Sequence, residues 1–198
     1  MNDESLSAGL ILASSSKYRK MLLHRFGIPF TCQSPGIDES AKINETPDKL
    51  VSRLAFEKAE RVSIEDPQAV VIGSDQIAVF QGQIVGKPGT HEAATEQLSS
   101  FSGQLIEFLT AVSVQCRNTG FKERYVDSTQ VSFRLLHSDE IERYLKTETP
   151  YDCAGAFKAE SMGIALFDSI RSDDPTALIG LPLIHTAAML RRAGLRLP

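Results

Sequence analysis

The sequence predicts an α/β protein built on a mixed sheet. Segments with helical periodicity interleave with short apolar, β-branched runs along the 198 residues, which is the pattern of a sheet covered by helices. The composition, 42% hydrophobic and 23% charged, is that of an ordinary soluble globular protein. Because no internal repeat, low-complexity tract or Pro/Gly-rich linker interrupts the pattern, we expect residues 1–198 to form a single domain.

A strand-to-helix junction near the N-terminus predicts an anion-binding site. Residues 10–13 (LILA) form a short apolar strand, and Ser14 and Ser16 precede a helix that we expect to end at Gly27. Backbone N–H groups, hydroxyl donors and the helix dipole converge at such a junction. Arg19, in the first helical turn, can add a bidentate bond to phosphate. The simpler interpretation is that the serines only cap the helix.

The next segment contributes two carboxylates and a lysine. A second strand is expected at residues 30–34, and the loop after it carries Asp38 and Glu39. Such an acidic pair is either solvated surface or a set of oxygen ligands for a hard divalent cation. A helix with a clear apolar face begins after Thr46. Its Lys58 faces either solvent or a cleft.

The stretch VVIGSDQ, residues 70–76, has the strongest functional character in the chain. Residues 70–73 form a buried strand, and we expect Asp75 to follow where the chain leaves the sheet. Ligands of α/β proteins usually bind at the carboxyl ends of strands. Gly73 allows another group to approach closely. The alternative is an ordinary strand end at which Asp75 caps a turn.

The rest of the chain continues the alternation of helices and strands. Lys87 follows a short hairpin and can contact phosphate, although the GKP tripeptide that contains it is not a P-loop. Lys158 and Glu160 lie in a segment rich in small residues, where the simplest interpretation is a local surface ion pair. The expected elements are a hairpin of residues 77–80 and 83–85, a helix at 91–101, a long hairpin of 105–116 and 121–136, a helix that opens at Ser138, and a helix at 182–192.

Charge and cysteine content limit the partners and the compartment. A net charge of −4 argues against binding to a nucleic acid polymer, which needs clustered Lys and Arg in excess. No apolar stretch approaches the roughly 20 residues that span a bilayer, and the acidic N-terminus is not that of a secretory signal. Cys32, Cys116 and Cys153 are an odd, widely spaced set, typical of free thiols. We therefore expect a cytoplasmic protein with no membrane partner.

These polar residues together have the composition of a site that hydrolyses a phosphoanhydride. Carboxylates can hold a divalent metal and activate water, while cations neutralise the charge on the phosphoryl group. Other hydrolytic chemistries have less support. The four histidines have neither HxxxH nor HxH spacing, and the chain contains no GxSxG motif.

The sequence resembles the Maf-like nucleoside triphosphate pyrophosphatases over nearly its whole length. The resemblance rests on SxSxxR (Ser14, Ser16, Arg19), GIDES, RLAFEKA, VVIGSDQ, GKP, CAGAFKAE and DPTALIGLPL, in that order. It implies an inosine-triphosphatase-like fold with a mixed central sheet and two lobes flanking a cleft, paired as a homodimer. It also implies cleavage of a small-molecule nucleotide between the α and β phosphates, with a divalent cation such as Mg, Mn or Co as cofactor.

The resemblance assigns roles to individual residues. Asp75 would be the proton acceptor, and Glu39 would be a ligand of the metal or the water, so Glu39 and Asp75 are the expected metal ligands. Lys87 would share in catalysis by holding the triphosphate. The remaining phosphate contacts are expected from Ser14, Ser16, Arg19 and Lys58.

Three further positions point to a subgroup of the family. Tyr18, Gln76 and Glu160 look like the base-site residues of members that hydrolyse 7-methyl-GTP, rather than the Arg, Thr and Gln of those that act on dTTP and UTP. The position of Tyr18 is often Trp in that subgroup. The chemistry agrees, because a methylated, cationic guanine stacks on an aromatic face and a carboxylate accepts from the guanine N1–H and amine.

Two other functions are compatible with the same sequence. The first is a pyrophosphatase that acts on dTTP, UTP or another modified nucleotide. The second is a nucleotide-binding regulator without turnover, since the family has been linked to inhibition of septum formation.

Overall fold

The structure is a computed structural model in which residues 9–197 are described, and it confirms an α/β protein with a mixed sheet. Those residues contain seven strands in the order β2-β1-β3-β5-β6-β7, with β4 paired to β3, and five α-helices. They form two compact units. Unit 1 contains the described residues up to Asp75, residues 110–126 and those from Asp174 onward, and unit 2 contains residues 76–109 and 127–173. The single domain over 1–198 stays a prediction.

In unit 1, parallel strands place the first helix and the central strand side by side. β1 (Leu10–Leu12) pairs in parallel with β2 (Thr31–Cys32) and with β3 (Val70–Phe80). Residue Ile11 is opposite Thr31 on one side and Val71 on the other. Parallel strands must be joined by a crossover connection. The 37 residues between β2 and β3 form such a connection and contain a long helix, residues 47–65.

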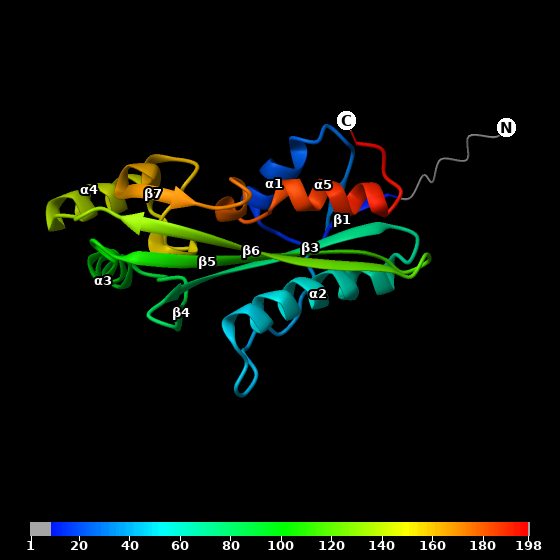
Figure 1. The fold of residues 1–198 in the computed structure, drawn as a ribbon, viewed down its shortest axis with the longest axis horizontal. Helices are drawn as coiled ribbons and strands as arrows, with labels where there is room; N and C mark the ends of the chain where they lie inside the picture. Colours follow the sequence, from blue (N-terminus) through cyan, green and yellow to red (C-terminus); the bar gives the residue numbers. More distant parts are fainter. Residues whose placement is uncertain (1–8, 198) are drawn as a thin grey trace. The chain divides into compact units, whose positions relative to one another are not determined.

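Helices cover both faces of the unit 1 strands. α1 (Lys17–His24) and α5 (Leu183–Arg192) lie on one face, and α2 (Pro47–Glu65) lies on the other (Figure 1). The period-2 alternation of the strands explains how both faces are filled. Leu12 and Ile72 pack in the cluster that includes α1 and α5, whereas the neighbouring Ile11 and Val71 pack with residues of α2.

Unit 2 is built around a cluster of phenylalanines. β4 (Gln83–Val85) pairs antiparallel with β3. β7 (Phe167–Arg171) pairs antiparallel with β6 (Phe121–Phe133). The neighbour of β6 on its other side, in the long hairpin, is β5 (Leu105–Cys116). α3 (His91–Phe101) packs against α4 (Ser138–Glu148). Ring centroids 4.8–5.7 Å apart, mostly at steep interplanar angles, link Phe80, Phe101, Phe108, Phe133, Phe157 and Phe167.

The structure corrects several expected boundaries. The central strand does not stop before Asp75 but continues to Phe80, so Asp75 lies inside β3 rather than at a strand end. Helix α1 ends at His24, earlier than Gly27 suggested. β7 was not expected, and the segments Ala154–Ala156, Met162–Leu166 and Ala177–Ile179 are 3₁₀ turns. Within residues 9–197 no helix has the length and apolarity needed to cross a membrane.

Gly73 sets how closely helix α2 approaches strand β3. A Cβ atom at this position would lie 2.2 Å from the carbonyl oxygen of Ala55 and 2.6 Å from the backbone nitrogen of Ala59. Both neighbours are backbone atoms, so the helix itself would have to move. The expectation that Gly73 permits a close approach is therefore confirmed, and the approaching element is α2.

We expect Gly73→Ala to lower the free energy of unfolding by about 1–3 kcal/mol, because the added methyl group overpacks this contact. Urea denaturation followed by circular dichroism measures the change. Gly86→Ala is the matched control, since its Cβ would meet open space. Equal stability of the two variants would show that α2 and β3 are not held at this distance.

Candidate functional site

Strand β3 carries the central residues of the candidate site to both of its faces. Ser74 and Asp75 are adjacent and buried, with 0% and 6% of their surface exposed. Because successive side chains of a strand point to opposite faces, Ser74 shares the face of Ile72 and Asp75 shares the face of Gly73. Ser74 therefore faces the chain around Gly180, and Asp75 faces helix α2.

Lys58 joins two carboxylates on the α2 face. Its ammonium Nζ lies 2.6 Å from Asp75 Oδ1 and 2.8 Å from Glu39 Oε1. The side chains of Lys58 and Asp75 are 6% and 9% exposed, whereas that of Glu39 is 60% exposed. A buried charge needs a close partner of opposite sign, and each of the two buried groups supplies one for the other. The sequence left open whether Lys58 faces solvent; the structure shows it buried.

Ser16 caps helix α1, as the simpler interpretation held, and Ser14 binds the N–H of that capping residue. Ser14 Oγ accepts a bond from the Ser16 N–H at 3.1 Å, and Ser16 Oγ accepts one from the Arg19 N–H at 3.4 Å. Both hydroxyls act as acceptors in these bonds, so each keeps an O–H donor that an anion can accept. Capping and anion binding are thus compatible at this junction.

Arg19 is tied to the same carbonyl as Ser74. Arg19 Nε and Ser74 Oγ each donate to the carbonyl oxygen of Gly180 at 2.9 Å. Burial lowers the pKa of Arg19, and the nearby charges of Asp75 and Glu39 raise it. A guanidinium stays protonated at neutral pH even so. The Gly180 carbonyl therefore links the predicted phosphate-binding arginine to the strand that carries Asp75.

The chain next to Gly180 is held by residues that the sequence analysis did not single out, since the Thr176 hydroxyl lies at hydrogen-bond distance, 2.9 Å, from the Leu181 carbonyl oxygen. Asp174 is fully buried, and its Oδ2 accepts a bond at 2.6 Å from the Ile184 N–H in the first turn of α5. Its Oδ1 accepts bonds from the N–H and the hydroxyl of Thr176 at 2.9 and 2.6 Å. The signal was the DPTALIGLPL motif, in which an Asp and a Thr precede a helix start.

The base-site candidates lie in different units. Tyr18 is half-buried on α1 in unit 1, and the Lys17 Nζ lies 5.0 Å from the centre of its ring, so the ring already accepts a cation. Gln76 is half-buried and belongs to unit 2 with Lys87 and Glu160, which are exposed. The suggested pairing of Glu160 with Lys158 is wrong. Lys158 Nζ binds the backbone carbonyl of Glu148, and it lies 3.4 Å from the Glu148 carboxylate.

The described residues contain two carboxylates suited to a divalent cation rather than a complete metal centre. No group of three or more His, Cys, Asp or Glu side chains gathers for metal binding within residues 9–197. Glu39 and Asp75 meet at Lys58. Magnesium is commonly held by one or two carboxylates, with phosphate oxygens of the substrate and waters as the other ligands. The donor set fits a cation that binds together with a nucleotide.

A family model for Maf-like proteins matches residues 9–193, which is most of the chain. The chain belongs to the Maf-like family. This Maf-like protein is 50% identical over 193 residues to a 7-methyl-GTP pyrophosphatase of Albidiferax ferrireducens, covering 98% of this chain and 97% of that one. It is 52% identical over 189 residues to a 7-methyl-GTP pyrophosphatase of Xanthomonas campestris pv. campestris, covering 96% and 98%.

Similarity to solved structures is weaker. The Staphylococcus aureus Ham1 protein matches this Maf-like protein with a TM-score of 0.44 and 14% identity, over 63% of this chain and 71% of that one.

In this Maf-like protein we expect Lys58→Met to lower the free energy of unfolding by about 3–5 kcal/mol, because it leaves the buried Asp75 carboxylate without its partner. Adding Asp75→Asn should restore more than half of that loss. Denaturant titrations of the two single variants and the double variant measure the coupling.

Lys146→Met serves as the control, since its pair with Glu142 is exposed and worth no more than about 1 kcal/mol. Additive effects of Lys58→Met and Asp75→Asn would contradict an energetically coupled pair.

Proposed function

We propose that this protein is a nucleoside triphosphate pyrophosphatase that hydrolyses 7-methyl-GTP to 7-methyl-GMP and pyrophosphate. The observation that carries the proposal is 50–52% identity, over 96–98% of the chain, to proteins named for this activity. The geometry of unit 1 supports it independently. An anion-binding helix start and a pair of carboxylates joined by a lysine are the groups that phosphoanhydride hydrolysis requires.

Asp75 is the proposed proton acceptor. A water oxygen attacks phosphorus at the α–β anhydride, its proton passes to a carboxylate oxygen of Asp75, and the bridging bond breaks to release pyrophosphate. Lys58 holds Asp75 at 2.6 Å and so fixes the direction of that carboxylate. Arg19 and Lys58, which their contacts in unit 1 hold in place, stabilise the negative charge that develops on the phosphate oxygens, and Lys87 adds a further cation.

Glu39 and Asp75 are the proposed ligands of a divalent cation, which is Mg, Mn or Co. When bound, such a cation supplies positive charge against the phosphate oxygens and lowers the pKa of bound water. The hydroxyls of Ser14 and Ser16 donate to the triphosphate at the start of α1.

Tyr18, Gln76 and Glu160 are the proposed base-recognition residues. The Tyr18 ring already has a lysine ammonium over it, and the positive charge of N7-methylated guanine suits the same face. A carboxylate at Glu160 accepts from the guanine N1–H and exocyclic amine and repels the carbonyl edge of uracil or thymine. Gln76 donates to O6 or to a ribose hydroxyl. We also propose a homodimer, as the family resemblance implies, and a cytoplasmic location, which the widely spaced set of three cysteines favours.

Asp75→Asn should lower kcat for pyrophosphate release from 7-methyl-GTP by at least about a hundredfold, because the amide cannot accept the proton. The affinity for the nucleotide should change little. Pyrophosphate release is measured from 7-methyl-GTP, GTP, UTP and dTTP, each with and without magnesium or manganese. Asp168→Asn, on exposed β7, is the matched control.

Three results would contradict this account of turnover. Full activity in Asp75→Asn removes Asp75 from the mechanism. Wild-type release from UTP or dTTP alone keeps the enzyme but overturns the substrate. Tight nucleotide binding with no release from any of them favours a nucleotide-binding regulator.

The double variant Tyr18→Arg, Glu160→Gln should shift the ratio of kcat/KM for 7-methyl-GTP to kcat/KM for UTP by at least about tenfold toward UTP. The reason is that the cation–π contact of Tyr18 and the hydrogen bonds accepted by the Glu160 carboxylate are each worth about 1 kcal/mol or more. Tyr18→Phe keeps the aromatic face and should keep the preference. A double variant that retains the full preference for 7-methyl-GTP would remove both residues from the base site.

A further inference from the structure

The loop that carries Glu39 lies between β2 and α2 and has no regular secondary structure. Residues 33–46 contain only a turn around Ile43 and Asn44, and Ile43 is 94% exposed. Ordering such a segment costs conformational entropy unless contacts fix it in advance. Glu39 reaches Lys58 at 2.8 Å from this loop. If Glu39 leaves Lys58 to bind a cation or a water, its contact with Lys58 no longer holds the loop, and another group must do so.

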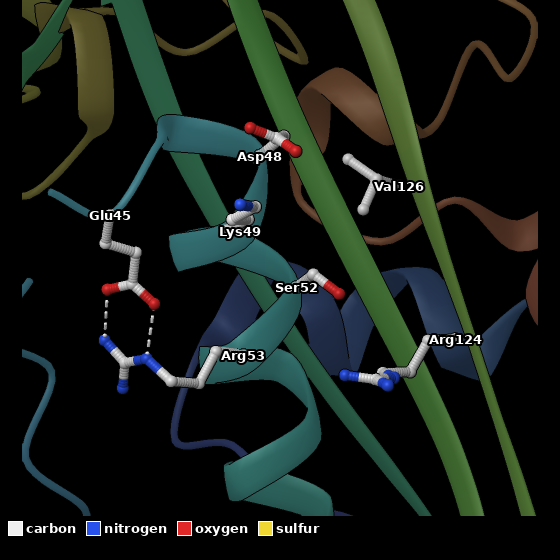
Figure 2. Close-up of a pocket in the computed structure, with 7 residues that line it drawn as sticks. All are labelled: Glu45, Asp48, Lys49, Ser52, Arg53, Arg124 and Val126. Carbon is white, nitrogen blue, oxygen red and sulfur yellow. Dashed lines mark hydrogen bonds and ion pairs between the residues drawn. The ribbon is translucent and has the colours of Figure 1, made fainter. Parts of the chain in front are cut away.

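Arg53, one and a half turns before Lys58 on the same helix, makes these contacts. Its Nε and one terminal nitrogen bind the two oxygens of Glu45 at 2.7 and 2.8 Å, in a bidentate fork that Figure 2 shows. The same terminal nitrogen donates to the Ser40 carbonyl at 3.0 Å, and the other donates to Glu57 at 2.9 Å. One guanidinium thus ties both ends of the segment from Ser40 to Glu45 to α2.

These bonds are better protected from solvent than an ordinary surface pair. The side chains of Arg53 and Glu45 are 15% and 9% exposed. Hydrogen bonds to Arg53 and to the Lys42 N–H lower the pKa of Glu45 to about 2, while Glu45 raises the pKa of Arg53. The stabilising effect of a carboxylate with a lowered pKa is complete above its unfolded value and is lost as the pH falls toward the folded one. The fork is therefore intact at neutral pH.

The loop also uses Glu45 and Asp38 to fix its own backbone. Glu45 Oε2 accepts from the Lys42 N–H at 2.9 Å, and Asp38 Oδ1 accepts from the Ser40 N–H at 2.9 Å. Glu39 lies between Asp38 and Ser40, and the residues on both sides of it are therefore held. The fork, the Ser40 carbonyl bond and these two backbone bonds form one connected network.

We propose that Arg53 is a positioning residue of the reaction, which presents the Glu39 carboxylate by clamping residues 40–45 to helix α2. This inference rests on the proposed role of Glu39 as a ligand of the cation or the water. Arg53 itself touches neither substrate nor the reacting atoms in this account. The guanidinium is required because its planar array of N–H donors reaches Glu45, Glu57 and Ser40 at once, which an ammonium cannot do.

Arg53→Lys is the test variant, because it keeps the charge and removes the fork. We expect kcat for 7-methyl-GTP to fall about 10- to 100-fold, as for other groups that support a ligand, with the nucleotide KM within about threefold of wild type. The magnesium concentration needed for half-maximal activity should rise. Hydrogen exchange of residues 38–46 should speed up at least about tenfold in the absence of any nucleotide. Arg61→Lys, at an exposed pair with Glu65 on the same helix, should change none of these.

A double-mutant comparison separates positioning from general stability. In a Glu39→Gln background, Arg53→Lys should lower kcat further by less than about twofold, because there is no carboxylate left to present. A merely structural role would give the same loss in both backgrounds. Glu45→Gln removes the fork from the other side and should reproduce the kinetic effects, which keeps the test valid even if Arg53→Lys does not fold.

The outcomes distinguish this inference from the proposed function. Unchanged loop exchange, or an equal loss of kcat with and without Glu39, in an enzyme that hydrolyses 7-methyl-GTP would overturn the role of Arg53 alone. If the wild-type protein releases no pyrophosphate, the proposed function is wrong, and so is the catalytic role of Arg53. The hydrogen-exchange measurement would still show whether Arg53 orders the loop.

Discussion

The ion pair between Lys58 and Asp75 is the interaction on which unit 1 depends. It joins a helix to a strand through two charged side chains that are both nearly inaccessible to water. Such a pair is stable only when both partners are held in place, because either one alone would be a buried, uncompensated charge. Two features hold them. Gly73 lets the backbone of α2 approach β3, and buried Gln115 donates to the Phe56 carbonyl of α2 at 3.0 Å.

The alternation of strand β3 turns this packing into a site with two sides. Asp75 contacts Lys58 on the face of α2, and Lys58 also binds Glu39. Ser74 and Arg19 share the Gly180 carbonyl on the face of α1 and α5. A one-residue shift of the strand would exchange the two faces. The parallel pairing of β1 with β3 prevents that shift and also places the start of α1 beside the strand. Register, packing and chemistry are therefore constrained together in unit 1.

Local patterns predicted much of this arrangement, and long-range contacts explain what they missed. The capping Ser16, the start of α2 and the buried strand around Val70 to Gly73 follow from turn chemistry and periodicity. Residues 70–73 and 77–80 were expected as separate strands, and the continuity of β3 between them was missed, because the polar residues Ser74, Asp75 and Gln76 look like a strand end. The shared Gly180 carbonyl joins residues more than 100 positions apart, which no local signal encodes. The contacts of Arg53 with Ser40 and Glu45 span only 13 and 8 positions, but they cross a loop that has no periodicity to predict them.

The groups gathered around Asp75 are proposed to bind and hydrolyse a nucleoside triphosphate. A crystal structure of the Asp75→Asn variant with 7-methyl-GTP and magnesium tests this most directly. We predict triphosphate oxygens within hydrogen-bond distance of Ser14, Ser16 and Arg19, with the cation bound by Glu39 and phosphate. A triphosphate bound elsewhere, for example beside Lys49 and Arg124 in the pocket along α2 (Figure 2), would contradict the account.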